Sequence, residues 1–243
     1  MTGTILNIIT VIVGGTIGLL FGARIPDKLK DTVIAGMGLF TAAMGIQMFL
    51  KTENPLIVLG SLLIGTLLGE WWRIEDGLQN LGKYLERRFS KSDDDSNKFV
   101  RGFLTASLLF CVGPMTILGS IYDGLNGDYN LLAVKSVLDG FAAMALASTL
   151  GIGVLFSIIV VFVFQGGISF LAMQLSAGMT AAMNNPVQFA NINSMINELT
   201  ATGGIVLIGL AISSLLEIKK IRVGNMLPAL AVAPLIVWVL SLF

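Results

Sequence analysis

The chain has 243 residues, of which 55% are hydrophobic and only 12% are charged, about half the charged fraction of an ordinary soluble domain. Fifteen basic residues balance fifteen acidic ones, there is no histidine and there is one cysteine, which excludes a nucleic-acid-binding surface, a disulfide framework, most zinc sites and the His-dependent catalytic triads. The 28 glycines suit closely packed membrane helices, so the composition predicts an all-α polytopic membrane protein.

A helix needs about 20 mostly apolar residues to cross the hydrocarbon core of a bilayer. Eight segments meet or nearly meet this length: Gly3–Phe21, Thr32–Leu50, Pro55–Trp72, Phe99–Ser120, Leu131–Leu150, Ile152–Met173, Ala201–Leu216 and Asn225–Leu242. The first has no basic region before it and no cleavage pattern after it, so we interpret it as a span and not as a signal peptide. Between the fifth and sixth spans we expect a tight turn near residues 148–153, where a glycine pair lies.

The basic residues predict the orientation of these spans. Segments 24–31, 73–101 and 217–224 hold 13 of the 15 basic residues, and eight alternating spans place all three segments on one side. The positive-inside rule makes that side the cytoplasm, so both termini are expected outside. The stretch 73–98 has apolar residues at helical spacing, which predicts an amphipathic helix along the cytoplasmic interface, followed by a polar linker at 91–96.

A faint internal repeat relates the two ends of the chain. Residues 6–20 resemble residues 158–172, and residues 35–46 resemble residues 201–212. The match pairs spans 1–3 with spans 6–8, and the odd offset of five spans inverts one copy in the membrane, an architecture known in transporters. The alternative is chance similarity between glycine-rich helices. We therefore expect one membrane domain over 1–243, with repeats at 1–72 and 152–243, the cytoplasmic segment at 73–98 and central helices at 99–150.

The fourth span contains Gly113-Pro114, followed by Thr116. Proline inside a helix removes one backbone hydrogen bond and opposes a preceding carbonyl sterically. Freed carbonyls inside a membrane need protein or a wet cavity as a partner, and broken helices of this kind bind substrates and ions. The span is therefore predicted to be either a broken helix at a binding site or a simple proline kink.

The fifth span carries two ionisable residues, Lys135 and Asp139. They are four residues apart, so they lie on one helical face and are expected to pair. Ionisable residues inside a membrane are costly and mark functional sites by default, although a neutral pair bridging helices is the structural alternative. Other polar residues of the spans, including Asn7 and Gln165, are interpreted as interhelical hydrogen-bonding groups.

A second polar cluster precedes the seventh span and ends in Gly203-Gly204. Its members are Asn191, Asn193, Asn197, Glu198, Thr200 and Thr202. The stretch 174–198 is interpreted either as a re-entrant or broken helix or as a polar extracellular loop. We predict that Gly113, Pro114, Thr116, Lys135, Asp139, Glu198, Thr200 and Thr202 converge on one polar cavity open to the outer side. The loop at 121–128 resembles part of a calcium loop but lacks the closing glutamate, so no metal and no cofactor are expected.

Several motifs in order carry a family resemblance: CVGPMTILGSIYDGLNGD, KSVLDG, QGG, NELTATGG and KIRVGNMLPAL. Together they resemble the YdfK/YqgA-like family of bacterial inner-membrane proteins, a domain family of unknown function numbered 554. The resemblance covers the whole chain and implies a compact multispanning protein of the bacterial inner membrane. It implies no substrate.

The function expected from these features is a small ion-coupled secondary transporter or permease for an unknown solute or ion. The alternatives are a non-transporting membrane assembly or regulatory module and a channel. An enzyme is not expected, because the sequence has no nucleophile with a recognisable base, no phosphate-binding loop and no metal cluster. The expected surroundings are lipid and a small solute, without nucleic acid, and eight short spans favour a homodimer to enclose a cavity.

Overall fold

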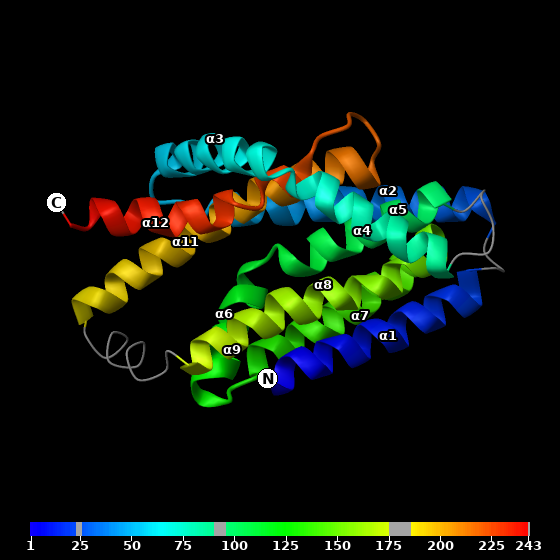
Figure 1. The fold of residues 1–243 in the computed structure, drawn as a ribbon, viewed down its shortest axis with the longest axis horizontal. Helices are drawn as coiled ribbons and strands as arrows, with labels where there is room; N and C mark the ends of the chain where they lie inside the picture. The colour runs from blue at the N-terminus through cyan, green and yellow to red at the C-terminus, as the bar shows by residue number, and fades with distance from the viewer. Residues whose placement is uncertain (23–25, 90–95, 175–185, 243) are drawn as a thin grey trace. The chain divides into compact units, whose positions relative to one another are not determined.

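The computed structural model describes residues 1–22, 26–89, 96–174 and 186–242, and all regular secondary structure in these ranges is helical (Figure 1). In chain order the elements are α1 (Thr2–Gly22), α2 (Asp27–Phe49), α3 (Pro55–Trp72), α4 (Ile74–Phe89), α5 (Ser96–Cys111), α6 (Pro114–Asn126), α7 (Asn130–Leu150), the 3₁₀-helix η2 (Ile152–Phe156), α8 (Ser157–Val161), the π-helix η3 (Phe162–Gly166), α9 (Gly167–Gln174), α11 (Pro186–Leu210), the π-helix η4 (Ala211–Leu215), the 3₁₀-helix η5 (Val223–Met226) and α12 (Ala229–Leu240). Seven of these helices or helical runs are long and apolar enough to cross a membrane, and α5 with α6 makes an eighth candidate if the bent pair is one span. The expected all-α architecture is confirmed.

Several helix ends follow the local signals of the sequence. The third span begins at Pro55, and the side chain of Asn54 accepts a hydrogen bond from the Leu56 N–H (3.1 Å), as an N-cap residue does. The fifth span ends at Gly151, whose φ of 81° lies in the region that favours glycine. The turn expected at 148–153 is therefore present.

Two buried carboxylates hold the starts of other spans. The Gly3 N–H in the first turn of α1 donates to Asp123 (3.1 Å), and the Gly224 N–H in η5 donates to Glu75 (2.8 Å). Each helix start has four backbone N–H groups without a partner inside the helix. A carboxylate from elsewhere in the chain therefore supplies the missing acceptor. Its negative charge is also stabilised by the positive end of the helix dipole.

The fourth span is interrupted at Gly113-Pro114, which favours the broken helix over the simple proline kink. Helix α5 ends at Cys111, α6 begins at Pro114, and the two are bent by 60°. At one end Gly153 of the sixth span lies against the backbone of Phe99, and at the other Gly124 lies against the backbone of Ser169. The bent pair therefore runs beside the sixth span from end to end, as a single interrupted crossing does and a re-entrant loop does not.

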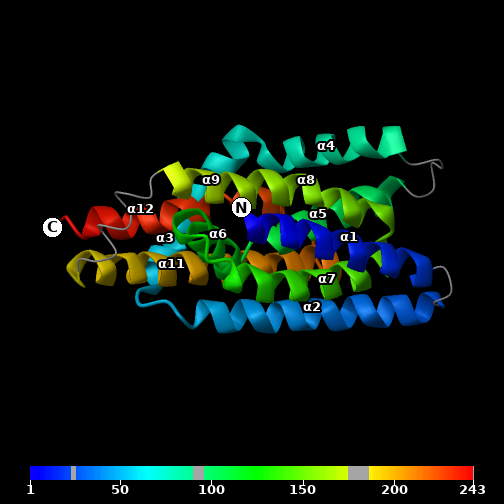
Figure 2. The ribbon, with the colours of Figure 1, turned by 90° about the horizontal axis from the view of Figure 1, so that it is seen from below.

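The direction in which helices pack supports eight crossings independently. Gly14 and Gly22 of α1 face Gly140 and Ser148 of α7, so these helices are parallel, and they lie side by side in both ribbon views (Figures 1 and 2). Parallel packing requires an odd number of crossings between α1 and α7. The three crossings are α2, α3 and the α5–α6 pair.

The third and eighth spans give the same result. In α3, Gly65 faces Ala229 and Gly69 faces Asn225, so α3 and the eighth span are antiparallel. An even number of crossings must separate two antiparallel spans, and the bent pair, α7, the sixth span and α11 supply four.

The described helices form two compact units. Unit 1 contains 1–37, 78–111 and 115–175, and unit 2 contains 38–77, 112–114 and 176–243. These units cut across the expected repeats, because the first and sixth spans both belong to unit 1 and the third and eighth both belong to unit 2. The inverted relation between spans 1–3 and 6–8 stays a prediction.

The polar stretch before the seventh span differs from both sequence interpretations where it is described. Residues 186–198 are neither a loop nor a re-entrant segment, since they are the first half of α11, which continues without interruption to Leu210. No glycine or proline occurs from 187 to 202, so nothing in the backbone chemistry ends the helix, and Pro186 suits its first turn. Residues 175–185 lie outside the described part of the chain.

The amphipathic segment after the third span is helical, as expected. Its residue Leu85 is buried against Phe99 and Phe103 of α5, so part of its apolar face covers another helix. Tyr84 is exposed. The polar linker expected at 91–96 lies almost wholly outside the described residues.

Replacing glycine by alanine usually stabilises a helix, and the α1–α7 contact predicts the opposite effect at Gly18. A Cβ at Gly18 would clash with the backbone carbonyl of Met144, so we expect Gly18→Ala to lower the free energy of unfolding by about 1–3 kcal/mol, the usual cost of overpacking. Gly36→Ala is the matched control, because nothing lies within 4 Å of a Cβ there. That control should be neutral or stabilising, by up to about 1 kcal/mol. Thermal unfolding in detergent measures both, and equal effects would contradict the packing argument.

The eight crossings and the positive-inside rule predict which loops face the cytoplasm. A cysteine at exposed Lys83 should react with a membrane-impermeant maleimide only after the cells are opened, whereas one at exposed Lys51 should react in intact cells. The natural Cys111 is buried and gives little background. Labelling of both positions from the same side would contradict the predicted topology.

Candidate functional site

An ion pair lies inside the fifth span. Lys135 and Asp139 are 6% and 8% exposed, and their side chains pair across one turn of α7, as their spacing predicts. The ammonium also lies 6.0 Å from the centre of the Phe110 ring, within range of a cation–π contact. Asp139 is nine residues into a 21-residue helix, about 13 Å along its axis and hence near the middle of the span.

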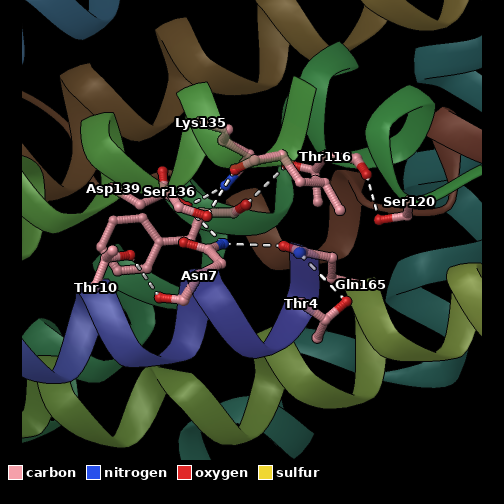
Figure 3. A network of polar contacts seen from close by, with 11 residues as sticks. Thr4, Asn7, Thr10, Thr116, Ser120, Lys135, Ser136, Asp139 and Gln165 are labelled. Carbon is pink, nitrogen blue, oxygen red and sulfur yellow. Dashed lines mark hydrogen bonds and ion pairs between the residues drawn. The ribbon is translucent and has the colours of Figure 1, made fainter. Parts of the chain in front are cut away.

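Two amides connect this ion pair to other spans (Figure 3). Asn7 Nδ2 of α1 donates to Asp139 Oδ2 (3.0 Å) and to Gln165 Oε1 (2.9 Å). Gln165 Nε2 in turn lies 3.4 Å from the Thr4 hydroxyl as a donor. A continuous polar chain therefore joins the first, fifth and sixth spans. Sequence reasoning identified Asn7 and Gln165 only as interhelical hydrogen-bonding groups, because nothing local shows that they meet Asp139.

The orientation of the Asn7 amide is fixed by its neighbours. Both groups that it faces are acceptors, so its nitrogen must point toward them. Asn7 Oδ1 is consequently buried with no hydrogen-bond partner among the described residues. A buried acceptor of this kind marks a position where a water molecule or a cation would be stabilised.

Gln165 lies in a π-helical turn of the sixth span. The segment η3 is one of two π-helices in the described residues, the other being η4 in the seventh span. Such wide turns are rare and occur frequently at functional sites, because they leave the ladder of backbone hydrogen bonds locally rearranged. The π-turn thus coincides with the residue that extends the polar chain into this span.

The broken fourth span provides a neighbouring polar feature in the same unit. The Thr116 hydroxyl donates to the carbonyl oxygen of Phe110 (3.0 Å), across the break between α5 and α6. One carbonyl near the break is therefore satisfied by a side chain, as the absence of water in a bilayer requires. Gly113 is half-buried.

Glu198 has a different environment in unit 2. Its carboxylate is 1% exposed and accepts hydrogen bonds from the Thr52 hydroxyl (2.7 Å) and from the N–H groups of Glu53 (2.8 Å) and Asn54 (2.9 Å). It therefore holds the start of α3. Thr200 and Thr202, further along α11, are also buried.

The loop between the second and third spans also accepts hydrogen bonds from α11. Glu53 accepts hydrogen bonds from the Ser194 hydroxyl and from Asn197 Nδ2, both at 2.9 Å. These reciprocal bonds fasten the 52–54 loop to α11. Asn197 of the predicted polar cluster thus has a structural partner.

The predicted site residues fall into both units. Lys135, Asp139 and Thr116 belong to unit 1, and Glu198, Thr200, Thr202, Gly113 and Pro114 belong to unit 2. Each unit is described by itself, so the convergence of all eight on one cavity stays a prediction. Within the described ranges, no group of three cysteine, aspartate or glutamate side chains is arranged to hold a metal ion.

Comparison with known proteins identifies the family. A family model described as "Protein of unknown function (DUF554)" matches residues 2–238. The chain belongs to the DUF554 family. It is 34% identical over 247 residues to the uncharacterized membrane protein YdfK of Bacillus subtilis (strain 168), covering 100% of this chain and 98% of that relative. It is 32% identical over 234 residues to the uncharacterized protein YqgA of Escherichia coli (strain K12), covering 95% and 94%. No solved structure matches.

This membership confirms the resemblance seen in the motifs. Together with the apolar helices, it places the chain among membrane proteins of unknown function.

The Glu53 contacts predict a pH-dependent stability. Hydrogen bonds from Asn197 and Ser194 lower the pKa of Glu53 from its ordinary value of 4.5. A lowered pKa stabilises the folded state above the unfolded pKa, and this stabilisation is lost as the pH falls through the folded value. We expect the wild type to unfold at a higher temperature than Glu53→Gln at pH 7, with the difference shrinking below about pH 4.5. Glu86→Gln controls for the loss of one negative charge, and a difference that does not depend on pH would contradict the argument.

Proposed function

We propose that this membrane protein is a small ion-coupled secondary transporter whose coupling site is the Lys135–Asp139 pair. The single observation that carries the proposal is the buried pair near mid-span, joined through Asn7 and Gln165 to two other spans. An ionised side chain at the centre of a membrane helix costs about 2.5–3.5 kcal/mol on insertion scales. A pair that served only to join helices would achieve the same packing with apolar side chains at lower cost.

The other buried carboxylates support a distinct role for Asp139. Among the described residues, Asp123, Glu75 and Glu198 each accept a backbone N–H at the start of a helix. These hydrogen bonds to helix starts explain why the three carboxylates are buried. Asp139 receives its bonds from side chains alone, those of Lys135 and Asn7. Side chains rearrange without unwinding a helix, so the Asp139 carboxylate is the one that can change partners cheaply.

Coupling follows from the charge balance of the pair. In the described state the lysine ammonium neutralises the aspartate carboxylate. A proton or metal cation arriving at Asp139 would displace the ammonium, and the released positive charge would need a new partner, such as an anionic solute or water. The break in the fourth span and the π-turn at Gln165 interrupt the regular backbone hydrogen bonding of elements around the pair. Binding of one species would thereby alter the affinity for another.

The test is ion flux in proteoliposomes. Purified protein is reconstituted with a pH-sensitive dye inside, a potassium diffusion potential is applied with valinomycin, and proton flux is followed with and without sodium gradients. We expect wild-type vesicles to move protons faster than empty vesicles, under the diffusion potential or under a sodium gradient, and Asp139→Asn to reduce that rate at least tenfold. Flux at the level of empty vesicles under every gradient would contradict the proposal.

A double variant separates coupling from folding. Removing one partner of a buried pair leaves an uncompensated charge and costs about 3–5 kcal/mol, so Lys135→Met alone is expected to unfold easily. Lys135→Met with Asp139→Asn removes both charges and keeps an oxygen that accepts from Asn7. This double variant should regain much of the thermal stability and stay inactive. If it transports at the wild-type rate, the pair is structural.

The alternatives give different outcomes in the same experiment. A channel would pass ions at rates that do not saturate, whereas a transporter saturates. A non-transporting assembly module would show no flux and no loss on substitution of Asp139. We further propose that the chain is not an enzyme, lies in the bacterial inner membrane with both termini outside, and works as a homodimer. Chemical cross-linking in native membranes tests the dimer.

A further inference from the structure

Two adjoining cavities open in unit 1, away from the ion pair. Their volumes are about 400 and 270 Å³, and they share Lys30, Lys98, Thr149 and Leu150 as lining residues. The larger is also bounded by Gly22 and Gly151. The smaller adds Arg101 and Asp31. Residues from α1, α2, α5 and α7 therefore line these two adjoining cavities, which together are called the hollow.

The hollow lies at one end of the spans. Gly22 is the last residue of α1, Leu150 is the last residue of α7, and Lys98 is in the first turn of α5. Gly151 has open space where a Cβ would be, so the chain turns there without filling the hollow. By the positive-inside rule this end is expected to face the cytoplasm, near the lipid headgroups.

The lining combines positive charge with an apolar wall. Among the described lining residues, Lys30, Lys98 and Arg101 are basic and Asp31 is acidic. Lys30 and Arg101 each also have another interaction within the chain. Leu19, Phe99 and Ile152 provide the apolar side of the larger cavity.

Two hydroxyl groups of the lining already donate their protons within the chain. Ser148 and Thr149 donate their hydroxyl protons to the carbonyl of Ala145, so these oxygens present acceptor positions. Both hydroxyl protons are therefore already donated, and the basic side chains are the charged donors that line the hollow.

A simpler explanation of these basic residues is that their positive charge interacts with the negative C-terminal ends of the α1 and α7 helix dipoles. That account explains charge near the helix ends and needs no cavity. It does not explain why basic side chains from two different helices border a hollow large enough for a headgroup, with apolar residues on its inner side. A phospholipid has a charged headgroup and apolar chains, which suit a hollow with basic residues at its edge and apolar residues on its inner side.

We propose that this hollow binds the phosphate group of an anionic ligand, with Lys30, Lys98 and Arg101 as its charge partners. The same chemistry is offered by a phospholipid headgroup in the inner leaflet and by free phosphate in solution. The site is separate from the Lys135–Asp139 pair, so it stands whether or not the protein transports.

The experiment measures phosphatidylglycerol binding to the whole purified chain in detergent by native mass spectrometry. Electrostatic attraction is worth about fivefold in affinity for each lysine near the phosphate, so Lys30→Gln with Lys98→Gln should weaken binding about 20-fold or more. The control is Lys51→Gln with Lys83→Gln, which removes two exposed lysines that line neither cavity. Unchanged thermal unfolding without lipid checks that both double variants fold.

Two further arms identify the source of the phosphate. Phosphatidylcholine, whose choline cancels the phosphate charge, should bind less tightly than phosphatidylglycerol to the wild type. Millimolar inorganic phosphate that displaces phosphatidylglycerol supports a site open to free phosphate, and failure to displace it supports a lipid site that also uses the apolar wall. Equal binding by the two double variants, or equal binding of the two lipids, would overturn the proposal.

Discussion

The fold depends on one constraint: inside a bilayer, buried polar groups need hydrogen-bond partners, which come from the protein or from a wet cavity. Three buried carboxylates meet it by accepting N–H groups at the starts of other helices, Asp123 for α1, Glu198 for α3 and Glu75 for the eighth span. These contacts join residues more than 100 positions apart. They provide specificity that apolar contact alone would not, because lipid tails are as apolar as the helices themselves.

Close approach of backbones provides the attraction that hydrophobic burial provides in water. Glycines at 14, 18 and 22 bring α1 directly against the carbonyls of α7, and Gly65 and Gly69 do the same for α3 and the eighth span. The same contacts fix which helices are parallel and which are antiparallel. Packing thus constrains whether the number of crossings between two helices is odd or even, and both constraints agree with the α5–α6 pair as one crossing.

The candidate coupling site shows how much of a site one sequence can predict. The pairing of Lys135 with Asp139 follows from a separation of one helical turn, and the break at Gly113-Pro114 follows from the chemistry of proline. The partners Asn7 and Gln165 are 132 and 26 residues away from Asp139 in the chain, and Asn7 bonds to both. Glu198 looks like Asp139 in sequence, yet it holds a loop start, and only its partners distinguish the two.

The sequence by itself determined the membrane class, the approximate positions of the spans, the place at which the fourth span is interrupted and the clustering of basic residues in three segments. All of these depend on local composition and on backbone chemistry within one or two turns. Only the tertiary structure decided that the α5–α6 pair crosses fully, that α11 continues through the polar stretch 191–198, and which carboxylates are structural. These features depend on which distant residues face one another, and a hydropathy pattern does not encode that, because every apolar helix presents nearly the same surface to its neighbours.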